Sequence, residues 1–267
     1  MRALASGIVS LLIAAGTLQA EPAPPLINPV GQPAANDGSI DAVLGELNGV
    51  GKKLQQFSAK LKLTETDQGL GTSTVRTGNV YFQKTPDGGA RIHVLFDQRI
   101  EEERKLAYKE KVEYLLDGPW LIDRNYKTRN EVKRQVLKPG QKMDLFKLGE
   151  GPFPLPIGQD PQDVHKVFDV KKIAPAKDDP ANTVHLELTP KPDTDLARKF
   201  HSLDVWVDAK THMPVRVDTL DPKQQTGRST ELNGIVVNPP GGLPDSDFQL
   251  PNIDDEKWNR HVESLND

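Results

Sequence analysis

The stretch from Gly78 to Phe96, GNVYFQKTPDGGARIHVLF, constrains the fold most, because apolar and polar residues alternate on both sides of a Thr-Pro-Asp-Gly-Gly break. Successive side chains of a strand point to opposite faces, so Val80 and Phe82 would share one face with Ile92 and Val94. The pattern predicts a β-hairpin with one apolar face, and that face needs something to cover it.

The same alternation recurs in short segments along most of the chain. Asp117-Gly118 is a typical tight-turn pair between two of these segments. Short, closely spaced strands joined by turns favour antiparallel pairing, so we predict one large antiparallel sheet. The later strands are expected in VHKVFDVKKI (164–173), NTVHLELTP, SLDVWVDA, HMPVRVDTL and STELNGIVVN.

Two segments break the alternation. Aliphatic residues at helical spacing between residues 40 and 54 predict an amphipathic helix capped by Ser39 or Asp41. Three glycines weaken this helix, so we expect packing against the sheet to hold it. Met143–Ile157 is apolar but interrupted by glycines and prolines, which predicts a short helix followed by an irregular apolar loop.

The N-terminal end has the layout of a secretory signal peptide over residues 1–20, with Arg2, a short apolar run and a small residue, Ala20, at its end. Residues 21–38 are rich in proline and alanine and predict a flexible leader. We therefore expect an exported chain with a single domain over 39–255 and a polar tail over 256–267. It has no cysteine, so its core must rely on hydrophobic burial, and a lipid anchor on cysteine is not expected.

Residues that would carry chemistry are sparse. The chain has 34 basic and 38 acidic residues, a balance that argues against a nucleic-acid partner. Its six histidines lack metal-ligand spacing, and it has no nucleophile elbow, phosphate loop or dinucleotide fingerprint. We expect no enzymatic activity, no metal site and no cofactor.

Two weaker patterns leave alternatives open. Asp204 and Asp208 could bind a cation, but the simpler interpretation is that they are strand-edge and turn residues, with Asp208 setting a hairpin turn. The basic run DRNYKTRNEVKRQVLK (123–138) could contact lipid head groups or acidic partners, or it could be a solvated strand face.

The order of these elements resembles the LolA family of periplasmic lipoprotein carriers over roughly residues 40–252. The resemblance is carried by KKLQQFSAKLKLTE, GNVYFQKTPDGGARIHVLF, YLLDGPWLIDRNYKTR and LDVWVDAKTHMPVRVDTLD, followed by STELNGIVVNPP and DFQLP. It implies a mainly β fold, an unclosed antiparallel β-barrel with a helical lid over an apolar cavity.

One position departs from the family pattern. The family typically has an arginine before the proline of the second strand signature, where it helps to latch the lid. Thr85 stands at that position here. Either another residue, such as Arg76 or Arg91, substitutes, or the latch is not used. Lys84 is adjacent but would point to the opposite face of the strand from Thr85.

The resemblance implies a monomeric periplasmic carrier for acylated lipoproteins or other lipids, with an inner-membrane release complex and an outer-membrane acceptor as partners. The alternatives are an envelope-stress sensor or regulatory binding protein on the same fold, and a lipid-processing hydrolase. The predicted lipid-binding residues are Leu61, Leu63, Val80, Phe82, Ile92, Val94, Phe96, Tyr114, Leu116, Trp120 and Ile122, and the predicted lid residues are Leu44, Leu47, Phe146 and Phe153.

Overall fold

The structure, a computed structural model, describes residues 39–138, 141 and 157–265. The predicted signal peptide and leader lie outside these residues. So do Phe146, Phe153 and all of the Met143–Ile157 insert except Ile157. Among the described helices, none has the length and apolar character to span a membrane.

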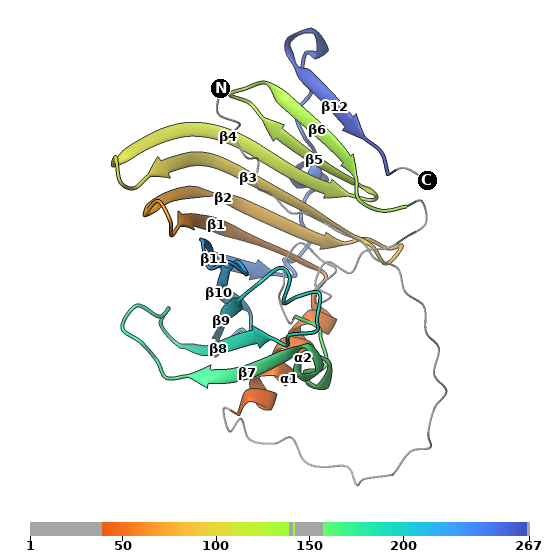
Figure 1. The fold of residues 1–267 in the computed structure, drawn as a ribbon. Helices are drawn as coiled ribbons and strands as arrows, with labels where there is room; N and C mark the ends of the chain where they lie inside the picture. The colour runs from red at the N-terminus through yellow and green to blue at the C-terminus, as the bar shows by residue number, and fades with distance from the viewer. Residues whose placement is uncertain (1–38, 139–140, 142–156, 266–267) are drawn as a thin grey trace.

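Twelve strands form one sheet in which two antiparallel meanders meet along β1 and β11 (Figure 1). The sheet does not close, because β12 and β7 lie at its two ends. The predicted fold class, an unclosed antiparallel sheet with helices, is therefore confirmed. The strands are β1 (Gln56–Asp67), β2 (Thr72–Lys84), β3 (Ala90–Glu101), β4 (Leu106–Asp117), β5 (Trp120–Asn125), β6 (Asn130–Gln135), β7 (Phe168–Ile173), β8 (Thr183–Pro190), β9 (Ser202–Asp208), β10 (Pro214–Leu220), β11 (Thr226–Val237) and β12 (Asn259–Glu263).

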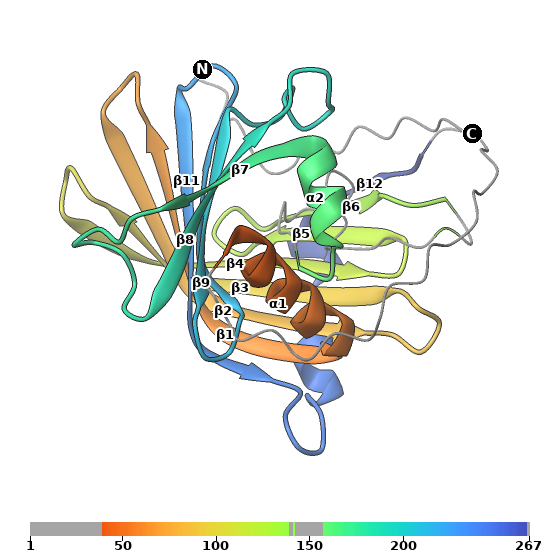
Figure 2. The ribbon, with the colours of Figure 1, turned by 90° about the horizontal axis from the view of Figure 1, so that it is seen from below.

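Two α-helices lie inside the bend of the sheet (Figure 2). α1 (Ile40–Lys53) begins where predicted, with the Ser39 hydroxyl accepting a hydrogen bond from the Ala42 amide at 3.2 Å. α2 (Pro161–Val167) differs from the prediction of a strand that starts at residue 164. Asp160 caps this helix and Pro161 opens it, and the strand β7 starts only at Phe168.

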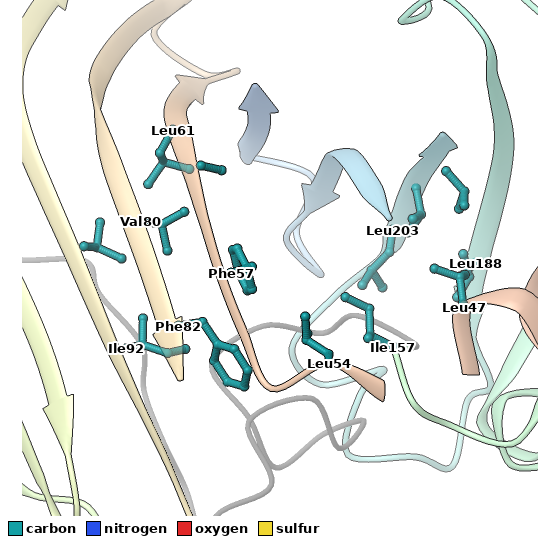
Figure 3. Close-up of a cluster of buried hydrophobic side chains, with 14 of the residues drawn as sticks. Leu47, Leu54, Phe57, Leu61, Val80, Phe82, Ile92, Ile157, Leu188 and Leu203 are labelled. Carbon is teal, nitrogen blue, oxygen red and sulfur yellow. The ribbon is translucent and has the colours of Figure 1, made fainter. Parts of the chain in front are cut away.

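We call the face of the sheet toward α1 the concave face. Phe57 on β1, Phe82 on β2, Ile92 on β3 and Leu116 on β4 are directly paired across neighbouring strands, so they share this face. All four are buried in one apolar cluster with Leu44 and Leu47 of α1. Figure 3 shows Leu47 beside Leu188, with Leu54 and Ile157 between the β1–β3 group and the Leu188 and Leu203 group. Period-two alternation therefore places the core on the face that carries the helices.

Two predicted lipid-binding residues lie on the opposite, convex face. The β4–β5 turn leaves only two residues between the paired Asp117 and Trp120, so Leu116 pairs with Leu121 and Leu115 with Ile122. The prediction that Trp120 and Ile122 share a face with Leu116 is therefore wrong, because the two-residue loop pairs even-numbered positions with odd-numbered ones. Trp120 and Ile122 are thus excluded from the concave face.

The C-terminal crossing segment (residues 239–258) runs over the convex face before the chain returns to the sheet edge. It holds two short 3-10 helices, η1 (Asp245–Phe248) and η2 (Asp255–Lys257). Phe248 is buried, and the Arg91 guanidinium lies 4.4 Å from its ring centre. The chain then adds β12 in parallel to β6, a strand within the predicted polar tail that the sequence analysis did not foresee.

Candidate functional site

The apolar part of the concave face contains the other nine predicted lipid-binding residues. Seven are buried and the other two, Leu63 and Tyr114, are half-buried against the same cluster. The Phe57 and Phe82 rings stack with their centres 5.4 Å apart, and Tyr114 packs edge-on against Phe96. The structure therefore brings these side chains together on one surface, and whether that surface binds lipid stays a prediction.

Helix α1 covers this surface through apolar side chains and one close backbone contact. Leu44 and Leu47 are fully buried. The Gly158 amide donates a hydrogen bond to the Leu47 carbonyl at 3.2 Å, and a Cβ on Gly51 would lie 2.2 Å from the Gly158 nitrogen. Because any side chain at Gly51 would collide with this backbone, the glycine is what allows α1 to pack so closely.

Three polar contacts fasten α1 at its sides. Lys84 Nζ donates to the Gly51 carbonyl at 3.0 Å. Glu46 lies 2.8 Å from His212 on the β9–β10 turn, and Asp41 lies 2.8 Å from His165 on α2. The His165–Asp41 pair is largely exposed, so we expect it to contribute little to stability. Helix α1, which carries the predicted lid residues Leu44 and Leu47, is thus held by polar contacts to three separate elements.

The arginines considered as substitutes at the Thr85 position have other partners. Thr85 closes the β2–β3 turn, with its hydroxyl hydrogen-bonded to Asp87. Arg76 pairs with Glu65, and Arg91 donates to Gln83 and pairs with Asp245. Lys84 reaches α1 instead, because it shares the concave face with Phe82 while Thr85 faces away.

One cavity has a volume of about 200 Å³. It lies where the β2–β3 and β4–β5 turns meet, with Ala90, Leu116 and Leu137 in its wall. Sites for small molecules commonly measure about 300–1,000 Å³. A second hollow of about 400 Å³, between β10 and β11, is mainly polar and includes Arg216 and Glu231.

Tyr114 lies where the apolar surface meets charged side chains. Burial raises the pKa of its hydroxyl above the ordinary value, and the negative charge of Asp123 raises it further. Asp123, paired with Tyr114 across β4 and β5, also has a raised pKa because it is buried. Tyr114 therefore remains a neutral hydroxyl at physiological pH.

The convex face carries a buried ionic network that the sequence did not reveal. Arg124 donates to Glu131 at 2.9 Å and to the Pro251 carbonyl at 2.6 Å, and Arg260 donates to the other oxygen of Glu131 at 2.8 Å. Arg124 and Glu131 are 6% and 3% exposed. Part of the basic run 123–138 is therefore buried structure rather than a solvated strand face.

Glu113 extends the convex network. Burial alone would raise its pKa, but the nearby His93 ring at 3.7 Å, the Tyr126 hydroxyl and the Lys111 ammonium lower the pKa to about 2. His93 Nδ1 lies 2.7 Å from the Asp247 carbonyl oxygen, and it must carry the ring proton because a carbonyl oxygen only accepts. His93 thus ties the crossing segment to β3, and Glu113 links β4 to Tyr126.

The two acidic residues considered as a cation site have other partners. Asp208 Oδ1 accepts from the Thr211 amide at 2.7 Å and from the Lys210 amide at 3.1 Å, which confirms the predicted turn. Asp204 lies 2.8 Å from His185 Nε2. Within the described part of the chain, no group of three or more metal-ligating side chains gathers.

Comparisons with sequences found no match. No protein-family model matches the chain, and no curated protein matches it significantly.

Comparisons with solved structures found matches at low identity. A Pseudomonas aeruginosa MucA/MucB complex matches with a TM-score of 0.46 and 13% identity, covering 79% of this chain and 60% of that one. An uncharacterised Thermus thermophilus protein matches with a TM-score of 0.44 and 10% identity, covering 84% and 97%. A LolA superfamily protein of Nitrosomonas europaea matches with a TM-score of 0.35 and 11% identity, covering 78% and 96%. This chain spans 60% of the length of the matched chain in the MucA/MucB complex and 64% of that in a further matched structure, a crystal structure of MucB.

Proposed function

We propose that this protein is a periplasmic, non-enzymatic carrier whose concave face binds the acyl chains of lipoproteins or other lipids and passes them toward the outer membrane. One observation carries the proposal. In the described residues, the apolar side of a twelve-stranded sheet is covered by only two helices, of 14 and 7 residues. Each methylene moved onto such a surface contributes about 0.8 kcal/mol.

Under this proposal, the described structure corresponds to a closed form. Leu44 and Leu47 occupy the surface that an acyl chain would take, and the cavity of about 200 Å³ is too small for a long chain. An acyl chain would therefore displace α1. The apolar contacts between α1 and the concave face would be replaced by apolar contacts between the acyl chain and that face. The glycines of α1 make the helix intrinsically weak, which lowers the cost of moving it.

A matched pair of glycine substitutions tests this mechanism. Gly51→Ala places a Cβ against the Gly158 backbone and should displace α1, whereas Gly45→Ala meets no atom within 4 Å. Titration with the fluorescent apolar probe 1-N-phenylnaphthylamine should show stronger binding to Gly51→Ala than to the natural chain. Gly45→Ala should bind no more probe, because alanine strengthens the helix by about 1 kcal/mol.

Cargo protection tests the carrier role itself. The protein should keep an acylated peptide soluble and leave the same peptide without its acyl group unbound. The proposal fails if the natural chain and Gly51→Ala bind neither the probe nor the acylated peptide.

A regulatory binding protein, such as an envelope-stress sensor, is the second candidate. The close packing of α1 on the sheet favours it, because recognition of a protein partner needs no acyl-sized cavity. Affinity capture from a bacterial envelope extract separates the two functions. Acylated proteins in the eluate support transport, while one stoichiometric partner without lipid supports regulation.

A further inference from the structure

The strands β10 and β11 separate partway along the sheet. Their ladder starts at the β10–β11 turn and stops at the pair Arg216 and Glu231. β10 begins only two residues before Arg216, at Pro214, whereas β11 continues to Val237 beside β1. Beyond Glu231, the edge of β11 that faces β10 therefore has no strand beside it among the described residues.

The hollow of about 400 Å³ occupies this separation. Val215 and Arg216 line it on the β10 side. Leu232 and Asn233 line it on the β11 side, and the β7–β8 loop adds Ala181. A sheet has about 4.8 Å between strands, about 3.4 Å per residue and about 10 Å between layers, so one residue occupies about 160 Å³. The hollow therefore has room for about two residues of an extended chain.

Backbone groups of β11 face this hollow. Neighbouring residues of an antiparallel strand direct their N–H and C=O groups to opposite edges. Leu232 and Asn233 both have partners on β1, so one of them directs its N–H and C=O toward β1 and the other directs them toward the hollow. A free strand edge binds an added strand through main-chain hydrogen bonds. The hollow thus offers a backbone donor and a backbone acceptor, which a peptide chain complements.

The charged side chains in the wall leave this edge as the main group for a ligand to bind. Arg216 Nε donates to Asp218 at 3.0 Å, and Lys62 pairs with Glu231 at 2.8 Å. Asp178, the remaining charged residue of the wall, is exposed, so solvent screens its charge. Recognition through backbone hydrogen bonds therefore fits the hollow better than recognition of a charged group.

We propose that the hollow between β10 and β11 is a docking site for an extended segment of a partner polypeptide, which adds to the free edge of β11 as a short strand. About two residues of the segment would pair beside Leu232 and Asn233. The inference goes beyond the proposed function and does not depend on it, because the site uses no acyl chain. It applies equally to a carrier whose cargo is a protein and to a regulatory binding protein.

Hydrogen exchange measured by NMR tests the free edge and its occupant. In the protein alone, one of the backbone amides of Leu232 and Asn233 should exchange quickly, and the other, bonded to β1, slowly. The peptide acetyl-Thr-Val-Thr-Val-Thr-amide should slow the fast amide at millimolar concentration. The same peptide with every backbone nitrogen methylated keeps its side chains but has no backbone donor. It should bind at least about tenfold more weakly.

Two alanines of the β7–β8 loop provide matched variants. Ala181 lines the hollow and Ala176 does not, and both are exposed. Ala181→Trp should fill the hollow and weaken binding of the unmethylated peptide at least about tenfold, because the backbone hydrogen bonds can no longer form. Ala176→Trp should leave the affinity within about twofold. Thermal unfolding checks that both variants are folded, and the methylated peptide decides the question on the natural chain if one is not.

Each outcome decides for or against the site. Slowed exchange that is lost with the methylated peptide and in Ala181→Trp supports strand addition. Equal binding of the two peptides overturns it, since side chains would then hold the ligand. Two slow amides in the protein alone, no slowing by the unmethylated peptide, or equal affinity in the two variants also overturns it. Binding of 1-N-phenylnaphthylamine is measured separately, so failure of this site is distinguishable from failure of the proposed function.

Discussion

The two faces of strands β2–β5 are held together in opposite ways. The concave face packs against α1 mainly through aliphatic and aromatic side chains, whereas the convex face binds the crossing segment through buried charges and directed hydrogen bonds. Apolar contacts are not directional, so one apolar partner can replace another at little cost. A buried ion pair that loses one member leaves an uncompensated charge. Contacts on the concave face can therefore be exchanged for others at little cost, whereas loss of a contact on the convex face is costly.

Two buried phenylalanines test this difference with the same substitution. Phe82→Ala on the concave face should lower the free energy of unfolding by about 3–5 kcal/mol, since it removes a stacked, fully buried ring. Phe248→Ala on the convex side should also destabilise, but by less, because the crossing segment keeps its other contacts. Chemical denaturation gives both values. Only Phe82→Ala should increase binding of an apolar probe, and equal increases would contradict the assignment of the two faces.

Removal of one member of a buried ion pair tests how much the contacts on the convex face contribute to stability. Arg124→Met should lower the free energy of unfolding by about 3 kcal/mol, because Glu131 would keep only Arg260 as a partner. Arg104→Met is the matched control, since Arg104 is 73% exposed and, among the described residues, pairs with Glu101 alone. Affinity for an acyl ligand should not change in either variant. A large loss of ligand affinity in Arg124→Met would show that the two faces are coupled.

Acid should weaken the convex network in a defined pH range. The pKa of Glu113 is about 2 in the folded protein against an ordinary value of 4.5. Because the pKa is lower in the folded state, the ionised carboxylate stabilises the fold at pH values above about 4.5. This stabilisation is lost as the pH falls from about 4.5 to about 2. Its size is about 3 kcal/mol. The difference in unfolding free energy between the natural chain and Glu113→Gln should therefore be constant above pH 5 and shrink below it, and a constant difference down to pH 2 would contradict the assignment.

Much of the sheet could be predicted because period-two alternation is a local property of the sequence. The β2–β3 hairpin and its apolar face follow directly from Val80, Phe82, Ile92 and Val94. The face on which Trp120 and Ile122 lie was predicted wrongly, because it depends on the length of the β4–β5 turn. Helix α2 was missed because Val164 and Phe168 also fit a strand, and the cap formed by Asp160 and Pro161 went unnoticed.

The convex network and the ion pair between Arg99 and Glu110 could not be predicted in the same way. Arg124 meets Pro251 across 127 positions of the chain, and Arg91 meets Asp245 across 154. The Arg99–Glu110 pair depends on a register shift in which β3 and β4 bulge between Phe96 and Gln98. Such pairings are set by the tertiary structure, so no local sequence pattern predicts them.

The seam between β1 and β11 determines the order in which this molecule can assemble. β1 pairs along its length with residues 226–237, so its second neighbour is supplied by a part of the chain about 170 positions away. The two meanders on either side form from local contacts and can fold early, whereas the seam has to close a very long loop. A chain that emerges N-terminus first would therefore expose the β11 side of β1 until almost the whole polypeptide is present, and binding of this edge by a chaperone during that interval would be of direct benefit.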